Sequence, residues 1–156
     1  MFPASVYEAR RRRLAELMRE QRGLLLFLGN QEAPMNYADN TYPFRQDSSF
    51  LYFLGVDEPG FAAVMDLDAD GTTLFADDLT LDDIVWTGPR PTVAERAARA
   101  GVSASAPAAA LADLLAEARD AGRPIHLLPP YRPENRLRLL ELLGIPPAEQ
   151  AARASL

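Results

Sequence analysis

A run of five apolar residues, Leu-Leu-Leu-Phe-Leu at positions 24–28, constrains the fold of this chain more than any other feature. The run lies between Gly23 and Gly29, and it is too short and too uniformly apolar for a surface helix. It therefore predicts a strand that is buried on both faces of its sheet. Such a strand needs a covering layer on each side, so we expect a three-layer α/β domain.

Helix and strand patterns alternate along the rest of the chain. A possible capping box at Ser5 and Glu8 predicts a first helix that ends at Gly23, and two more boxes start at Thr80 and Thr92. The other expected elements are strands at 61–67, 72–76 and 124–128 and helices at 108–121 and 134–143. Residues 103–112 are Ala-rich and predict a loop that leads into a helix. This order predicts one domain over residues 1–156, with a mixed sheet.

Composition excludes several classes of function. The 156 residues carry a net charge of −6 and the pI is about 4.8, which argues against a nucleic-acid partner. Cysteine and lysine are both absent, so disulfides, thiolate chemistry and Schiff-base chemistry are excluded. No apolar run reaches the length of a membrane span, and a cytoplasmic location is the default expectation. The Ala-rich, lysine-free composition suggests a high-GC bacterial source.

Two groups of aspartates are candidate cation ligands. The first group matches the spacing of an EF-hand loop and consists of Asp66, Asp68, Asp70, Gly71 and Asp77. Its flanks have the composition of strands, so a hairpin turn is favoured. The second group, Asp77, Asp78, Asp82 and Asp83, could hold two divalent metals. Helix capping explains these aspartates more simply, because neither His nor Glu lies beside them.

The remaining candidates favour structural roles. His126 is the only histidine and lies within an apolar strand pattern, so it cannot form a zinc triad and is interpreted as structural. Residues 10–13 are four consecutive arginines that wrap around a helix, which favours a solvated helix face over an anion site. Serine nucleophile elbows and Gly-rich nucleotide loops are absent.

Residues 44–59, Phe-Arg-Gln-Asp-Ser-Ser-Phe-Leu-Tyr-Phe-Leu-Gly-Val-Asp-Glu-Pro, form the most distinctive segment. We refer to it as the signature segment. Its candidate site residues are Phe44, Arg45, Gln46, Asp47, Ser48, Phe50, Tyr52 and Gly55. A structural interpretation is a short helix that packs aromatic rings on the sheet, with Arg45 holding the preceding irregular segment at 30–43. A buried Arg45 would need a carboxylate partner, and Asp47 is a nearby candidate.

Three segments in order resemble the N-terminal domain of the Xaa-Pro peptidases, the aminopeptidase P and prolidase group. They are Tyr-x-x-Arg-Arg from Tyr7, the signature segment, and Ile-Val-Trp-Thr-Gly-Pro-Arg at 84–90. Arg45 and Gln46 favour this branch over creatinase, which shares the fold, whereas Leu51 departs from the aromatic residue often found there. The resemblance implies a ribonuclease-H-like α/β domain.

The same resemblance implies that the chemistry lies elsewhere. In this family two metal ions, commonly manganese, are held by two Asp, one His and two Glu of a C-terminal pita-bread domain. A metal-bridging hydroxide there attacks the peptide bond before proline. We therefore expect no catalytic residue, metal or cofactor in this chain. The implied partners are the C-terminal catalytic domain, further copies of the protein, and a peptide with proline at its second position.

The resemblance also gives Trp86 two possible roles. In some family members the matching tryptophan reaches into the substrate pocket of a neighbouring subunit, where a flat ring can pack on a prolyl ring. Alternatively, Trp86 packs into the core after a short amphipathic helix. Two other functions remain open for the whole chain: a stand-alone binding or scaffold protein that retains this domain, and a metal-dependent hydrolase built on the aspartates at 66–83.

Overall fold

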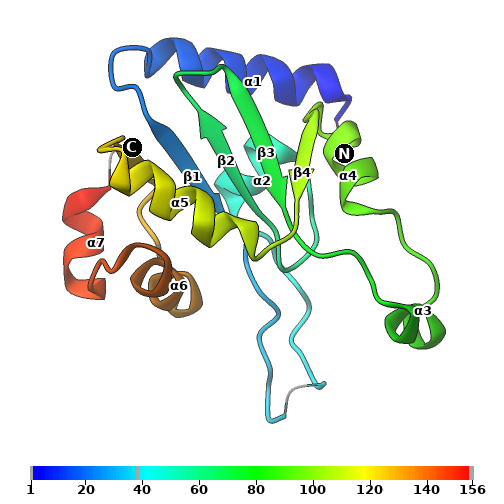
Figure 1. Cartoon of the computed structure of the whole chain (residues 1–156). Coiled ribbons are helices and arrows are strands. Elements are labelled where there is room, and N and C mark those ends of the chain that lie inside the picture. Colours follow the sequence, from blue (N-terminus) through cyan, green and yellow to red (C-terminus); the bar gives the residue numbers. More distant parts are fainter. Residues whose placement is uncertain (1, 38, 155–156) are drawn as a thin grey trace.

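A five-stranded mixed sheet forms the centre of the molecule (Figure 1). The computed structural model describes residues 2–37 and 39–154. Its strands are β1 (Leu24–Leu28), β2 (Ala62–Asp66), β3 (Gly71–Phe75), β4 (Ala104–Ala106) and β5 (Ile125–Leu127). The strand order is β4-β3-β2-β1-β5; β1 and β3 are antiparallel to β2, whereas the outer strands β4 and β5 run parallel to their neighbours. The predicted mixed sheet is confirmed.

Helices cover both faces of the sheet. Their bounds are α1 (Ala4–Leu17), α2 (Ser48–Leu54), α3 (Leu81–Thr87), α4 (Val93–Arg99), α5 (Ala110–Asp120), α6 (Pro133–Leu143) and α7 (Pro147–Arg153). Helices α1, α2 and α4 share one hydrophobic core with the sheet, and α5 and α6 share the other. Helix α3 contributes to neither core (Figure 1). The expected three-layer α/β architecture is therefore confirmed.

Strand β1 joins the two cores, as its composition predicts. Leu25 and Phe27 face the core under α1, α2 and α4, whereas Leu24 and Leu26 face the core under α5 and α6. All four side chains are at most 2% exposed. Because successive side chains of a strand point to opposite faces, a strand between two helical layers must be apolar at every position.

The structure differs from the expected elements at three places. Helix α1 begins after Pro3 without a side-chain cap, so the predicted Ser5 capping box is wrong, and the helix ends at Leu17 instead of Gly23. Residues 104–106 form β4, although a loop was expected there. Ala-Ser-Ala has little strand preference, and these residues are extended because they pair with β3 at the sheet edge. Helix α7 was not anticipated either, and it starts at Pro147.

Candidate functional site

The signature segment folds into helix α2 and its caps. Asp47 is the N-cap, and its Oδ1 accepts a hydrogen bond of 2.9 Å from the Phe50 amide. Gly55 is the C-cap at φ +67°, where a Cβ atom would lie 2.2 Å from the Tyr7 ring. Phe50 is fully buried beneath the helix. The predicted short helix that packs aromatic rings on the sheet is thus observed, and glycine is required at 55 both by φ and by space.

Gln46 is the buried centre of this region. Its Oε1 accepts from the amides of Asn30 (2.7 Å) and Asp47 (2.9 Å). Its Nε2 donates to the carbonyls of Val56 (3.2 Å) and Glu58 (2.8 Å). One side chain therefore ties the end of β1 to both ends of α2. All its polar atoms are used inside the protein, so Gln46 acts as a structural residue.

Arg45 differs from the expectation of a buried ion pair. Its side chain is exposed, and the Asp47 carboxylate is used to cap α2. The suggested partnership of Arg45 with Asp47 is therefore wrong. The Arg45 carbonyl instead accepts a hydrogen bond of 2.8 Å from Asn30 Nδ2, so the backbone of Arg45 holds the start of the irregular segment. Phe44 is half-buried and Ser48 is exposed at the first turn of α2.

The arginine run on α1 was expected to form a solvated helix face, but two of its members, Arg10 and Arg11, contact other parts of the protein. The Arg10 guanidinium lies 4.0 Å from the centroid of the Tyr52 ring and also contacts the Phe2 and Tyr7 rings. Arg11 is 6% exposed and donates to the carbonyls of Phe53 (2.8 Å) and Gly101 (2.6 Å). Burial lowers the pKa of Arg11 from its ordinary value, with a smaller opposing effect of Glu8. Thus Tyr7, Arg10 and Arg11 join α1 to the signature segment.

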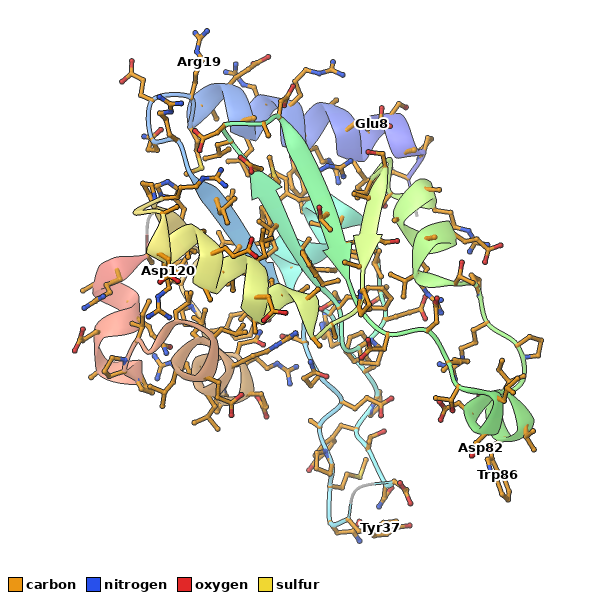
Figure 2. The ribbon with its side chains drawn as sticks, in the orientation of Figure 1. Glu8, Arg19, Tyr37, Asp82, Trp86 and Asp120 are labelled. Atoms are coloured by element: carbon orange, nitrogen blue, oxygen red, sulfur yellow. The ribbon has the colours of Figure 1, made fainter. Side chains whose placement is uncertain are left out.

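Trp86 lies on α3, apart from the core. It is 87% exposed, and no residue of α3 is buried. Figure 2 shows the indole ring pointing away from the body of the protein. The alternative in which Trp86 packs into the core is therefore wrong. The capping box of Thr80 and Asp83 is confirmed, so local capping supports this helix in place of a buried face.

The irregular segment at 30–43, which we call the entrance loop, extends from the same end of the sheet as α3. Strands β1 and β3 run in the same direction, and the entrance loop follows β1 while α3 follows β3. Both segments project beyond the sheet, with Tyr37 near the end of the loop (Figures 1 and 2). An isolated bridge between Pro34 and Thr41 closes the loop. Tyr37 and Tyr42 are exposed.

The EF-hand spacing group lies at a hairpin turn between β2 and β3, as favoured, except for Asp77, which follows β3. Asp66 Oδ1 accepts from the amides of Asp68 and Ala69, and Arg123 and Arg22 bind the carboxylates in what we call the ionic cluster (Arg22, Asp66, Asp68 and Arg123). Burial alone would raise the pKa of Asp66, but hydrogen bonds from Arg123 and the turn amides hold it below its usual value. Hydrogen bonds from Arg22 and then Arg123 lower the pKa of Asp68. The EF-hand alternative is wrong.

Local hydrogen bonds explain most of the second group of aspartates. Asp77 accepts from the Ala108 amide, Asp78 from the Val93 amide, and Asp83 from Thr80. The contacts of Asp78 and Asp83 at the starts of α4 and α3 are the capping roles that the sequence favoured, whereas Asp77 binds an amide in the turn before α5. Across residues 2–37 and 39–154, no three His, Asp or Glu side chains gather in a way that could hold a metal ion.

His126 has a structural position on β5. It is 8% exposed, and its Nε2 donates a hydrogen bond of 2.7 Å to the Arg22 carbonyl. This contact links β5 to the connection between α1 and β1, which agrees with the structural interpretation. Sequence reasoning did not single out two other buried polar residues, Asn30 and Asn135, whose amides meet at 3.2 Å. An Asn two residues after a buried strand was the available signal for the first of them.

Comparison with known proteins shows which family the chain resembles. The family described as "Aminopeptidase P, N-terminal domain" matches residues 7–126. The chain belongs to the aminopeptidase P N-terminal domain family. The match includes Tyr7, the entire signature segment and Trp86, so the residues that pack α1 on α2 lie within the matched range.

Several proteins similar to this chain are named as probable Xaa-Pro aminopeptidases. A probable Xaa-Pro aminopeptidase of Talaromyces stipitatus is 32% identical over 148 residues, which cover 91% of this chain and 29% of that protein. A second, from Ajellomyces dermatitidis, is 36% identical over 78 residues, covering 50% of this chain and 15% of the relative. The chain thus spans less than a third of the length of these curated relatives.

Solved structures of the family share the fold. A low-pH form of Escherichia coli aminopeptidase P matches with a TM-score of 0.63 and 27% identity, covering 75% of this chain and 27% of that one. The Pseudomonas aeruginosa aminopeptidase matches with a TM-score of 0.73 over 95% of this chain and 34% of its own, and its 23% identity supports the fold alone. These relatives are fungal and bacterial, so the suggested bacterial source stays a prediction. Within the described ranges no helix is both long and apolar enough for a membrane span.

Proposed function

We propose that this chain serves as the non-catalytic N-terminal domain of a Xaa-Pro aminopeptidase, a metallopeptidase that removes the residue before proline. The observation that carries the proposal is the family match over residues 7–126, in a chain that covers only 29% of a probable Xaa-Pro aminopeptidase. The groups that the chain does contain support it. Its conspicuous polar side chains, Gln46, Arg11 and the capping aspartates, form hydrogen bonds within the fold.

The domain would act through its projecting segments. Helix α3 exposes Leu81, Val85 and Trp86 by 82%, 79% and 87%, and apolar surface of this kind is typical of an interaction site. We propose that α3 and the entrance loop shape the substrate entrance of the enzyme and support its oligomerisation in the cytoplasm. Two divalent metals, commonly manganese, would then belong to a C-terminal catalytic domain. The substrate would be a peptide with proline at its second position.

Hydrolysis of a short peptide with proline second, with manganese added, tests this proposal. The 156-residue chain alone should be inactive, whereas the same chain extended through the catalytic domain of its gene should be active. In the extended protein, Trp86→Ala should lower kcat/KM by about tenfold, the loss of roughly 1.4 kcal/mol of binding at the transition state. Leu137→Ala is the matched control, because Leu137 is exposed on α6, outside the projecting segments.

Each possible outcome decides between functions. Activity of the 156-residue chain itself would refute the assignment and return attention to the aspartates at 66–83. A gene that ends after this domain would favour the stand-alone scaffold protein. Equal activity of the Trp86→Ala and Leu137→Ala variants would refute the role of α3 at the entrance while leaving the family assignment intact.

A further inference from the structure

A cavity of about 170 Å³ lies at the base of the entrance loop, against the connection between β5 and α6. Four of its lining residues, Ala33, Tyr42, Pro43 and Phe44, carry mainly apolar side chains and are called the apolar wall, and Gln31 is a polar neighbour in the lining. Two arginines from distant parts of the chain, Arg45 and Arg132, also line it. The cavity is thus amphipathic, with side chains from the two segments that follow the parallel strands β1 and β5.

The charge of this cavity is opposite to that of the whole chain. Two arginines and no acidic residue are among its lining residues, although the chain carries a net charge of −6. Elsewhere in the fold, Arg22, Arg96 and Arg123 pair with carboxylates. Neither Arg45 nor Arg132 donates a side-chain hydrogen bond to another residue in the described part of the chain. The cavity therefore has spare cationic donors, which favour an anionic ligand.

A buried polar network fixes the backbone on both sides of the cavity. Asn30 Nδ2 donates to the Arg45 carbonyl (2.8 Å), and Asn135 Nδ2 donates to Asn30 Oδ1 (3.2 Å). Asn30 and Asn135 are 1% and 6% exposed. Asn135 lies in the first turn of α6, three residues after Arg132, so this network holds the two arginine-bearing segments together. Helix α6 also places the positive end of its dipole beside Arg132.

We propose that this cavity binds the C-terminal carboxylate of a short peptide whose last side chain is small and apolar. A guanidinium binds a carboxylate through two parallel hydrogen bonds, and the apolar wall would take the neighbouring side chain. The cavity volume suits a chain end. An aspartate or glutamate inside a longer chain would fit less well, because the polar backbone on both sides of it would lie against the apolar wall. The proposed site consists only of residues of this chain, so it is independent of the proposed peptidase role.

Titration of the isotope-labelled 156-residue chain by NMR tests the site with N-acetyl-Ala-Ala as the probe. Saturable shifts should appear for the amides of residues 31–33, 42, 44, 45, 132, 134 and 135. The same dipeptide with an amidated C-terminus should give none. Arg45→Gln and Arg132→Gln should each weaken binding by about tenfold, the typical value of a charge-assisted hydrogen bond. Arg19→Gln is the control, because Arg19 is exposed on the opposite side of the protein (Figure 2).

Other outcomes would overturn the proposal. Equal binding of the amidated dipeptide would exclude carboxylate recognition. Equal binding of inorganic phosphate would indicate a general anion site without a role for the apolar wall. Equal binding of N-acetyl-aspartate amide would assign the site to acidic side chains. Arg45→Lys keeps the positive charge but lacks the planar guanidinium group, so it should bind N-acetyl-Ala-Ala more weakly than wild type. Circular dichroism of every variant would confirm that the fold is retained.

Discussion

Replacement of Gln46 by Met should destabilise the domain strongly, because the new side chain has a similar shape but no polar atoms. Four backbone groups lose their partner: the amides of Asn30 and Asp47 and the carbonyls of Val56 and Glu58. The Asn30 and Val56 contacts are fully buried, whereas the other two are part-buried and can recruit water. A buried polar group without a partner costs about 1–3 kcal/mol.

The two buried groups therefore set the magnitude of the effect. Their combined cost is about 2–6 kcal/mol, from which about 1 kcal/mol is recovered because Met is more apolar than Gln. We expect Gln46→Met to lower the free energy of unfolding by about 3 kcal/mol, and to lower Tm by about 6–12 °C. The total stability of a domain is about 5–15 kcal/mol, so the variant should still fold.

Urea denaturation followed by circular dichroism is the appropriate assay. Trp86 is 87% exposed, so its fluorescence would report the core poorly. Gln31→Met is the matched control: Gln31 is exposed on the neighbouring loop, and its replacement should change the stability by less than about 0.5 kcal/mol. If Gln46→Met is as stable as the control, the four hydrogen bonds do not hold the signature segment, and our structural interpretation of Gln46 is wrong.

Gln46→Glu adds a test that depends on pH. A carboxylate can still accept from the two amides but cannot donate to the two carbonyls, so burial should raise its pKa above the unfolded value of about 4.3. A raised pKa of an acid means that stability is lost as pH rises through that range. The stability difference between wild type and Gln46→Glu should therefore be larger at pH 7 than near pH 4. A difference that does not change with pH would contradict the buried position of this side chain.

Two further predictions concern a glycine and the ionic cluster. Gly55→Ala should lower the free energy of unfolding by about 3 kcal/mol or more, because it adds a collision with the Tyr7 ring to the strain of φ +67°. Gly122→Ala is the control, because Gly122 has the same φ with open space around it, and this change should cost only about 1–2 kcal/mol. Equal losses of stability in thermal melts would refute the steric argument. Arg123→Gln should destabilise the chain at neutral pH. The pKa values of Asp66 and Asp68 are lowered in the folded state, so the stabilisation by these carboxylates is lost as pH falls below about 4. The difference in urea midpoint between Arg123→Gln and wild type should therefore become smaller at that pH. A difference that stays constant with pH would contradict this linkage.

The sequence predicted much of the fold because local patterns determine those elements. The apolar run of β1 matched its strand residue for residue, and the capping boxes at Thr80 and Thr92 both formed. Strand β4 could not be predicted, since Ala-Ser-Ala becomes extended only by pairing with β3. Likewise, the exposure of Trp86 could not be predicted, because an apolar side chain on a short helix shows no sign in the sequence of whether another element covers it.

The candidate site divides in the same way. The residues of the signature segment and its resemblance to the aminopeptidase P N-terminal domain were readable from the sequence, because motif residues lie in fixed order along the chain. Their separate roles needed the tertiary structure: Gln46 is buried, Arg45 faces a cavity, and Asp47 caps a helix. Arg45 and Arg132 are 87 positions apart in the sequence, and the parallel pairing of β1 with β5 brings them to one cavity. Local sequence determines which elements form, whereas contacts between distant segments decide which side chains are buried, because burial depends on packing that no short stretch of sequence contains.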